Sequence, residues 1–395
     1  MRVVGIVAEY NPFHNGHQYH IEQAKKIANA DYAVVVMSGN FVQRGAPAIM
    51  PKHLRAKAAL SCGADLVLEL PVCYATGTAE QFAYGAVSLL NKLGCVDAIC
   101  FGSECGNVDE LSELAHILCN ESFEYKNELQ LNLCLGLSFP AARETALNIL
   151  YPDKNYGQIL SEPNNILGIE YLKALYRLNS NIEPFTIQRA ISHYHDENLQ
   201  EQFSSATAIR NTLASKGFSD LAGQIPSDCI SICENFYHKR YPIYANDFSL
   251  LLKFKLLGES AESLTTYADV SEELANRIYN HLNDYISFEQ FCERLKTKEI
   301  TYSRISRALI HILLGIKKSD YNEIGYVRVL GFRETTAILL GTIKHSCSLP
   351  LVTKLGIDNK MLQQDIYASD LYESVVTDKF QTHFINELQQ AIVKL

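Results

Sequence analysis

The 395-residue sequence lacks most of the features by which membrane, secreted and small disulfide-rich proteins are identified. It contains no tryptophan, no CxxC motif and no uncharged apolar run of about 18 residues, so no candidate membrane span is present. The first residues, MRVVGIVAEY, enter a strand-like pattern directly, without the charged, apolar and cleavage regions of a signal peptide. We therefore expect a cytoplasmic protein without a membrane partner.

Metal-binding patterns are also scarce. The eleven cysteines are scattered, mostly in apolar runs, and the closest pairs, such as Cys229 and Cys233, match no common metal motif. Buried, reduced thiols are therefore the leading interpretation, with a zinc or redox site as the alternative. His193 and His195 are a weak second metal candidate because no third ligand stands nearby. We expect no metal site formed by the protein alone.

The chain does have enough apolar sequence for complete hydrophobic cores. The residues AVILMFWYC make up 47% of it, charged residues make up 20%, and the net charge is −9. At roughly 150 residues per domain, the length suggests two or three domains. These values exclude both a disulfide-stapled mini-protein and a disordered chain.

Two alternating hydrophobic periods organise the first 190 residues. Short β-branched runs cover residues 3–7, 32–37, 65–70 and 97–101. Helical patterns lie between them at residues 17–28, 51–62 and 80–93, and Gly63 and Gly94 stand where left-handed caps are expected. Apolar strands separated by helices are typical of a parallel sheet covered on both faces. We predict a doubly wound, Rossmann-like α/β domain that binds its ligand beyond the carboxyl ends of the strands.

The remaining sequence is mostly helical. Residues 107–150 favour a helical insertion, a helix follows from about residue 164, and residues 184–188 favour one more strand. The segment SATAIRNTLASKG opens with a hydroxyl cap and closes on Gly217. Later helical patterns lie around residues 248–257, 271–282, 302–315 and 361–376. We predict an α/β domain over residues 1–217 and a mainly helical domain over residues 218–395.

The most informative stretch is GIVAEYNPFHNGHQYHI, which leaves the first predicted strand and enters the first predicted helix. His14 and His17 stand three residues apart, on one side of the helix start, and Gly16 lets the backbone approach a ligand closely. The N–H groups and dipole of a helix start favour a phosphate, and imidazoles there can donate to phosphoryl oxygens. This HxGH motif predicts a nucleotide site. A structural turn or a metal pair is the alternative, although the adjacent Glu of the HExxH motif is missing.

HxGH after a first strand resembles the nucleotidyltransferase superfamily, whose members attack the α-phosphorus of a nucleotide and release pyrophosphate. The resemblance becomes closer along the chain. In order, EYNPFHNGH, MSGNFVQRGAPA, GADLVLELP, FGSE, PNNILGIEYLKAL and SATAIR are similar to the bacterial tRNA(Met) cytidine acetate ligase family. Later segments, RISRALIHILLGI and YVRVLGF, also fit this family, so the similarity covers nearly the whole chain.

This resemblance implies a two-step reaction. Acetate would attack the α-phosphate of ATP to give acetyl-adenylate and pyrophosphate, and the acetyl group would pass to N4 of the wobble cytidine of elongator tRNA(Met). The resemblance implies ATP with Mg²⁺, acetate and this tRNA as partners, and no tightly bound cofactor. His14 and His17 would be the catalytic pair. The implied ATP-binding residues are Val7, Ala8, Glu9, Tyr10, Asn11, Pro12, Phe13, His14, Asn15, Gly16, His17, Gln18, Tyr19, His20, Gly102, Asn164, Arg189 and Ala190.

Further candidates carry a structural alternative beside the functional one. Ser205, Thr207 and Arg210 of SSATAIR resemble a signature in which a helix start binds the outer phosphates, but an ordinary capped helix also explains them. Arg44 follows the second strand and could contact acetate, phosphate or tRNA. Asn164 and Asn165 could bind a ligand or cap their helix.

One segment of the acidic chain is basic. Residues 294–333 hold nine basic and three acidic residues, a net charge of +6. A basic face on an acidic body would attract a phosphate backbone, and Tyr302 and Tyr326 could stack on bases. The candidate tRNA-binding residues are Arg304, Arg307, Lys317 and Lys318. A solvated helix surface is the alternative.

Two other functions remain open. A small-molecule adenylyltransferase acting on a phosphorylated metabolite would share HxGH but would not need the basic segment. An RNA-binding protein could use the nucleotide site only for regulation.

Overall fold

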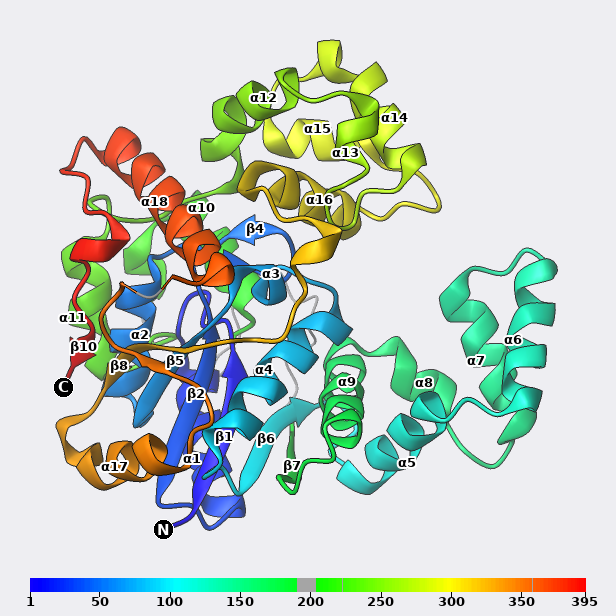
Figure 1. Ribbon diagram of the computed structural model, residues 1–395, viewed down its shortest axis with the longest axis horizontal. Coiled ribbons are helices and arrows are strands. Elements are labelled where there is room, and N and C mark those ends of the chain that lie inside the picture. Colours follow the sequence, from blue (N-terminus) through cyan, green and yellow to red (C-terminus); the bar gives the residue numbers. More distant parts are fainter. Residues whose placement is uncertain (190–203, 222, 357) are drawn as a thin grey trace.

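The computed structural model describes residues 1–189, 204–221, 223–356 and 358–395, which fold around one central sheet (Figure 1). This sheet has eight strands, and β10, β8, β5, β2, β1, β6 and β7 follow one another across it, with β9 beside β8. The strands of the sheet are β1 (Val3–Ala8), β2 (Tyr32–Ser38), β5 (Leu66–Leu70), β6 (Ala98–Ser103), β7 (Glu183–Gln188), β8 (Val327–Phe332), β9 (Leu351–Val352) and β10 (Val393–Lys394). A separate hairpin pairs β3 (Phe41–Val42) with β4 (Ala46–Pro47).

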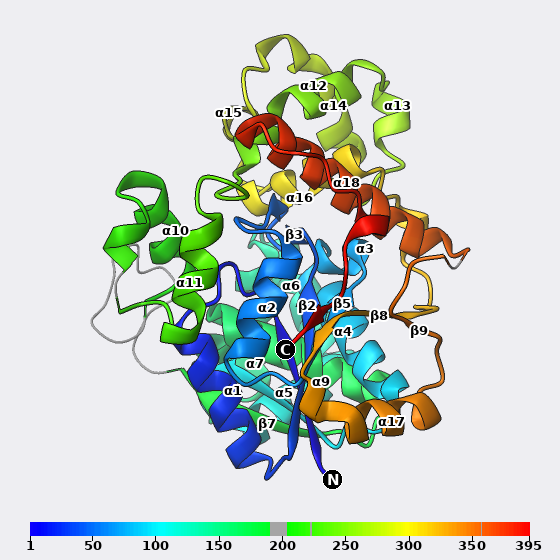
Figure 2. The same cartoon turned by 90° about the vertical axis from the view of Figure 1, so that its left-hand side faces the viewer.

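Helices cover both faces of the sheet (Figures 1 and 2). The helices of the first part of the chain, some of which lie away from the sheet, are α1 (Asn15–Ile27), α2 (Lys52–Ser61), α3 (Val72–Ala75), α4 (Ala79–Leu93), α5 (Val108–Cys119), α6 (Phe123–Cys134), α7 (Phe139–Leu150), α8 (Tyr156–Ser161), α9 (Pro163–Arg177) and α10 (Ala206–Ser215). The later helices are α11 (Ser227–Phe236), α12 (Ser249–Leu257), α13 (Ala261–Leu264), α14 (Glu272–Asn280), α15 (Phe288–Leu295), α16 (Tyr302–Leu314), α17 (Ala337–Ser346) and α18 (Lys360–Phe380).

The alternation of side chains along β2 explains why helices are needed on both faces. Val34 and Val36 join the hydrophobic cluster that contains residues of α4 and α9, whereas Val35 joins the cluster that contains residues of α1 and α2. All three are fully buried. A strand that is apolar on both faces must be covered on both, as in doubly wound folds. The predicted parallel α/β arrangement is therefore confirmed.

The predicted elements of the first 217 residues are observed with small shifts in their ends. The parallel strands β5, β2, β1, β6 and β7 correspond to the five predicted runs. Gly63 and Gly94 have positive φ values of 105° and 68°, in agreement with their predicted capping role. Residues 107–150 form α5, α6 and α7, and the last two form a hairpin that projects from the body (Figure 1).

The predicted division at residue 217 needs a correction. Residues 218–395 are mainly helical, but they are not separate from the sheet, because β8 pairs with β5 in antiparallel register and β9 and β10 pair with β8. The chain thus leaves the sheet after β7, forms helices α10 to α16, and returns to extend the opposite edge of the sheet. Within the described residues, none of the helices combines the length and apolar surface needed to cross a membrane.

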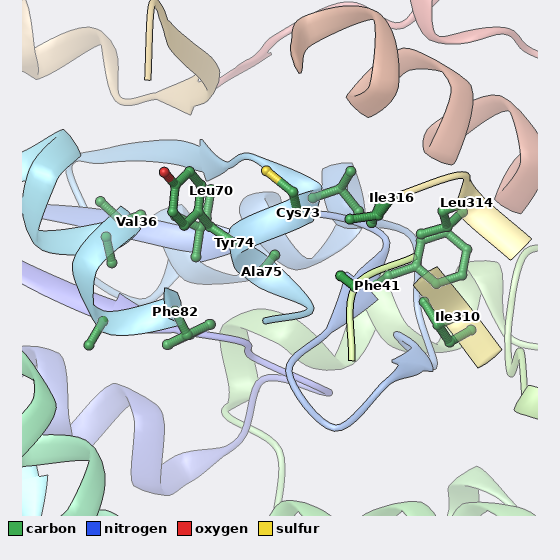
Figure 3. Close-up of a cluster of buried hydrophobic side chains, with 14 of the residues drawn as sticks. Val36, Phe41, Leu70, Cys73, Tyr74, Ala75, Phe82, Ile310, Leu314 and Ile316 are labelled. Atoms are coloured by element: carbon green, nitrogen blue, oxygen red, sulfur yellow. The ribbon is translucent and has the colours of Figure 1, made fainter. Parts of the chain in front are cut away.

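Helices α12 to α16, which we call the helical module, are joined to the sheet through apolar contacts. Ile310 and Leu314 of α16 lie beside Phe41, in the same buried cluster as Leu70 and Cys73 (Figure 3). A continuous core across this junction fixes the module above the carboxyl ends of the strands, where the predicted ligand site lies.

The loop between β3 and β4 packs closely against the module. Gly45 has a φ of 73°, and a Cβ there would lie 2.2 Å from the backbone nitrogen of Arg307. The hydroxyl of Ser306 donates to the carbonyl of Gly45 over 2.7 Å. Only glycine combines this backbone conformation with so close an approach.

A buried charge network ties the late segments to the sheet. The Lys52 ammonium lies 2.7 Å from Glu69 Oε1 and 2.9 Å from Glu387 Oε1, and it donates to the hydroxyl of Ser369 over 2.7 Å. Arg328 of β8 approaches the same Glu387 at 3.4 Å. Both cations and both carboxylates are buried, so their charges depend on one another for solvation.

Candidate functional site

A cavity of about 590 Å³ opens beyond the carboxyl ends of β1, β6 and β7. Its walls come from the loop that leads from β1 into α1, from the β3–β4 region, and from the starts of α9 and α10. A volume in the range of roughly 300–1,000 Å³ is typical of small-molecule and cofactor pockets. The cavity thus stands where ligands bind in doubly wound sheets.

The structure brings most of the predicted nucleotide residues together. The predicted residues that line the cavity are Val7, Ala8, Glu9, Tyr10, Asn11, His14, Gly16, His17, Tyr19, His20, Gly102, Asn164, Arg189, Ser205, Thr207 and Arg210. Pro12, Phe13, Asn15 and Gln18 do not line it. Phe13 is instead buried and packs against Tyr10, with ring centroids 4.8 Å apart. Ala190, His193 and His195 lie outside the described residues.

The two histidines of the motif form the start of α1. His14 is the N-cap, and its Nδ1 accepts a hydrogen bond from the Gly16 N–H over 3.1 Å. Nδ1 of His17 accepts from the His14 N–H over 3.3 Å. The imidazole rings stack with centroids 3.7 Å apart. A backbone N–H can only donate, so both Nδ1 atoms are unprotonated and each neutral ring carries its proton on Nε2.

Burial keeps these rings neutral. It lowers the pKa of His14 to about 3, and the positive charges of Arg189 and Arg210 add to the effect. It also lowers the pKa of His17 well below the ordinary value, with further contributions from His14 and Arg189. At neutral pH the site therefore presents two uncharged imidazoles whose Nε2–H groups are hydrogen-bond donors.

Arg55 fixes the loops that carry the site. Its buried guanidinium donates to the carbonyls of Met50, at 2.9 Å, and Glu9, at 2.5 Å, and also to those of Ser38 and Gly39. These carbonyls belong to the segments that follow β1 and β2, and one cation thus satisfies acceptors that the sheet leaves unpaired.

Arg210 and Glu9 complete the loop after β1. Nη1 of Arg210 donates to the Asn11 carbonyl over 2.8 Å, and its Nη2 donates to the Thr207 hydroxyl over 3.0 Å. Oε1 of Glu9 accepts from the Gln43 N–H over 2.9 Å. Ser205 is the N-cap of α10, in agreement with the structural alternative for that residue, and it also lines the cavity.

The start of α9 and the loop after β6 form the other side of the cavity. Glu104 accepts hydrogen bonds from Asn164 and Asn165, and Arg189 donates to Oδ1 of Asn164 over 3.4 Å. Asn164 lines the cavity, whereas Asn165 is buried and accepts from the N–H groups of Glu104 and Cys105. Asn165 thus neither lines the cavity nor caps α9, and its side chain instead holds the backbone that follows β6.

The charge of the cavity suits an anionic ligand. Arg44, Arg189 and Arg210 line it, with Glu9 and Glu289 as the acidic residues of the lining. No group of three or more His, Cys, Asp or Glu side chains that could hold a metal ion occurs among the described residues. None of the eleven cysteines forms a disulfide, and Cys134 is the exposed one.

Two residues that support the site were not among the candidates. Arg55 stands in the helical pattern HLRAKAALS, and a cation on the apolar side of that pattern was the available signal. Glu104 ends the FGSE segment, two residues after the Gly102 that was singled out. Their partners are backbone groups and amides distant in sequence, which residue patterns alone do not identify.

The basic segment is only partly available to a ligand. Tyr326 is buried, and its hydroxyl donates to Asp365, so the expectation that it stacks on bases is wrong. Arg328 is buried against Glu387, and Arg307 pairs with Asp269 at 2.8 Å. Lys317 and Lys318 are exposed. Arg304, Arg307, Lys317 and Lys318 do not line the cavity.

Comparisons with known proteins agree with this geometry. Residues 1–387 match the family described as HIGH Nucleotidyl Transferase. The chain is 44% identical over 382 residues to the tRNA(Met) cytidine acetate ligase of Caldanaerobacter subterraneus subsp. tengcongensis, covering 94% of this chain and 95% of the relative. It is 44% identical over 392 residues to the enzyme of that name from Acetivibrio thermocellus, covering 94% of each.

Two solved structures share the fold over the full chain at 32% identity. Apo Thermotoga maritima TmcAL superposes with a TM-score of 0.93 and full coverage of both chains. The same protein bound with alpha-thio ATP superposes with a TM-score of 0.89, covering 100% of this chain and 99% of that one.

Proposed function

Because this chain belongs to the HIGH nucleotidyl transferase family and, within it, to the tRNA(Met) cytidine acetate ligases, we propose that it joins acetate to a cytidine of tRNA(Met) at the expense of ATP. The observation that carries this proposal is the pair of neutral imidazoles at the start of α1, that of His14 buried and that of His17 partly buried, in a cavity lined by cationic side chains. This arrangement suits the charge stabilisation that transfer at phosphorus requires.

In the first step, a carboxylate oxygen of acetate forms a bond to the α-phosphorus of ATP and the bond to the pyrophosphate oxygen breaks. The products are acetyl-adenylate and pyrophosphate. The Nε2–H groups of His14 and His17 donate to phosphoryl oxygens as negative charge develops on them. Acetate is itself the nucleophile, so the protein needs no Ser or Cys for the attack.

In the second step, N4 of the cytidine attacks the acetyl carbonyl carbon, AMP leaves, and N4 loses a proton. The target is the wobble cytidine of elongator tRNA(Met), and the product is N4-acetylcytidine. A base in an anticodon loop can be unstacked and placed in a pocket at low cost. The helical module lies above the carboxyl ends of the strands and is the part of the chain that would approach the tRNA.

Mg²⁺ would accompany ATP rather than occupy a dedicated site. The cavity offers only Glu9 and Glu289 as carboxylates among its described lining, and Glu9 already accepts from a backbone N–H. Mg²⁺ commonly takes most of its ligands from phosphates and water, which agrees with this lining. The ion would offset the negative charge of the pyrophosphate that leaves.

The reaction products test this proposal. With ATP, acetate and elongator tRNA(Met), we expect AMP, pyrophosphate and N4-acetylcytidine, the last detected by mass spectrometry of the digested tRNA. Without acetate, pyrophosphate release should stop. AMP retained in a dinucleotide would instead indicate a metabolite adenylyltransferase, and the absence of turnover would indicate a binding protein.

Charge reversal at Arg304 and Lys318 tests the approach of the tRNA. We expect the double substitution Arg304→Glu/Lys318→Glu to weaken tRNA binding by roughly tenfold at moderate salt, because each cation contributes through phosphate contacts. ATP binding should not change, since neither residue lines the cavity. A filter-binding titration at two salt concentrations measures the effect.

Lys344→Glu is the matched control, because this exposed lysine lies on α17, at the other end of the molecule (Figure 1). Arg307 is left unchanged because it pairs with Asp269. Equal tRNA affinity in the double variant and the control would refute this surface.

A further inference from the structure

The carboxylate of Glu104 accepts three hydrogen bonds from the first turn of α9. Its Oε1 accepts from Nδ2 of Asn164 over 2.5 Å and from the backbone N–H of Asn164 over 3.2 Å. Its Oε2 accepts from the backbone N–H of Asn165 over 2.8 Å. Glu104 stands directly after β6, so one carboxylate joins the end of a strand to the start of a helix distant in sequence.

The contact is reciprocal. Oδ1 of Asn165 accepts from the N–H of Glu104 over 2.9 Å and from the N–H of Cys105 over 3.1 Å. Asn165 is buried, so its amide cannot exchange these partners for water without cost. The backbone that carries Glu104 is thereby fixed relative to the helix that its side chain caps.

These contacts decide which way the Asn164 amide faces. Nδ2 donates to Glu104, so Oδ1 must point to the opposite side, where it accepts from Nη1 of Arg189 over 3.4 Å. If the amide turned over, its NH₂ group would face the guanidinium, and two donors would meet. Gly102 leaves room for the Arg189 side chain, because a Cβ there would lie 3.2 Å from Cγ of that residue.

We propose that Glu104 is a positioning residue for the ATP reaction, which orients the Asn164 amide so that this amide holds Arg189 in the cavity. Glu104 does not line the cavity, whereas Asn164 and Arg189 both do. Arg189 also lies near enough to lower the pKa of the neighbouring imidazoles of His14 and His17. This inference rests on the proposed function for the identity of the ligand, and it adds Glu104 to the residues that act in the reaction with ATP.

A simple capping role is the competing explanation, since carboxylates stabilise helix starts in general. The two roles differ in their dependence on Asn164. A cap acts through the backbone N–H groups and does not need the Asn164 side chain. An orienting residue acts through that side chain and loses its effect when the amide is absent.

A double-mutant cycle separates the two roles. We expect Glu104→Gln to raise KM for ATP in acetate-dependent ATP–pyrophosphate exchange about tenfold, the loss typical of a hydrogen bond to a charged group. In an Asn164→Ala background the same substitution should change KM by less than about twofold, because interacting residues are not additive. If the double variant raised KM by the product of the two single-variant factors, the substitutions would act independently and the proposal would be overturned. An unchanged KM in Glu104→Gln would also overturn it.

Two further variants control for folding. Glu110→Gln removes an acidic residue from the first turn of α5 and should leave KM unchanged. Glu104→Asp keeps the negative charge near the start of α9 but shortens the reach of both carboxylate oxygens, so KM should rise; the unfolding midpoint of each Glu104 variant shows whether it is folded under the assay conditions. If the wild-type protein shows no exchange at all, the proposed function fails; calorimetric binding of alpha-thio ATP to the same variants then tests Glu104 by the same criteria.

Discussion

Replacing His14 by asparagine is expected to lower the rate of acetate-dependent ATP–pyrophosphate exchange by about 100- to 1,000-fold, the usual effect of removing one preorganised donor to a developing charge. The substitution distinguishes the role of Nδ1 from that of Nε2. Asparagine is among the best N-cap residues, and its Oδ1 can take the place of Nδ1 as acceptor for the Gly16 N–H. It has no counterpart to Nε2–H, so α1 stays capped while the phosphate donor is lost.

ATP affinity should fall less than turnover in this variant. A donor that strengthens its contact as charge develops on phosphorus contributes more to the transition state than to the bound ATP. Calorimetric titration with alpha-thio ATP and exchange kinetics measure the two quantities in the same preparation. His345→Asn, an exposed substitution on α17, is the control. Near-wild-type exchange by the His14 variant would exclude a catalytic role for that ring.

The variant should also respond differently to acid. The folded pKa of His14 is lowered from 6.5 to about 3, so between these values the unfolded chain binds a proton that the folded chain does not. The stability that depends on neutral His14 is fully present above pH 6.5 and is lost progressively as the pH falls toward 3. His14→Asn removes this dependence, so its unfolding free energy should fall less steeply than that of the wild type over this window.

The parallel part of the fold could be predicted from sequence because its signals are local. Strands β1, β2, β5 and β6 are short, largely apolar runs, and the intervening helices have the expected spacing. Strand β8 was not predicted. Its sequence, VRVLGF, contains a charged residue and a glycine, and Arg328 is compatible with the sheet only because Glu387 neutralises it from near the end of the chain.

The candidate site shows the same limit. His14, His17 and Arg189 could be located because they follow predicted strands, and the carboxyl ends of parallel strands meet at one edge. Arg55 could not be recognised, because its four acceptors are backbone carbonyls that converge only after folding. Tyr326 was misplaced for a related reason. Its neighbours in sequence are basic and suggest a surface, but its hydroxyl contacts Asp365 on α18, a distant helix.

The largest expected loss of stability comes from Lys52→Met, which should lower the free energy of unfolding by about 3–5 kcal/mol, as when one partner of a buried ion pair is removed. The Lys52 ammonium is enclosed by Glu69, Glu387 and Ser369, and its own pKa is raised by the two carboxylates despite the opposing effect of burial. Methionine preserves most of the volume, so the loss reports the missing charge rather than a cavity. Urea unfolding at pH 8 measures it.

The loss in Lys52→Met should depend on pH with a definite sign. Burial raises the pKa of Glu387, and the positive charge of Lys52 is the largest of the effects that lower it. Removing this cation should therefore raise the pKa of Glu387 in the folded protein. A carboxyl whose pKa is higher in the folded than in the unfolded protein stabilises the fold most at pH values below its unfolded pKa. This contribution to stability is lost as the pH rises through the folded pKa. The deficit of the variant should therefore be larger at pH 8 than at pH 5.

A second substitution tests whether unpaired charge is the cause. Lys52→Met/Glu69→Gln removes one buried anion together with the cation, and it should recover part of the lost stability because the remaining anion, Glu387, still has Arg328 beside it. Lys92→Met is the matched control, since this lysine forms its ion pair with the exposed Glu323 and should contribute less than about 1 kcal/mol. Equal losses in Lys52→Met and Lys92→Met would mean that the buried network does not join the C-terminal segment to the sheet in the way its geometry indicates.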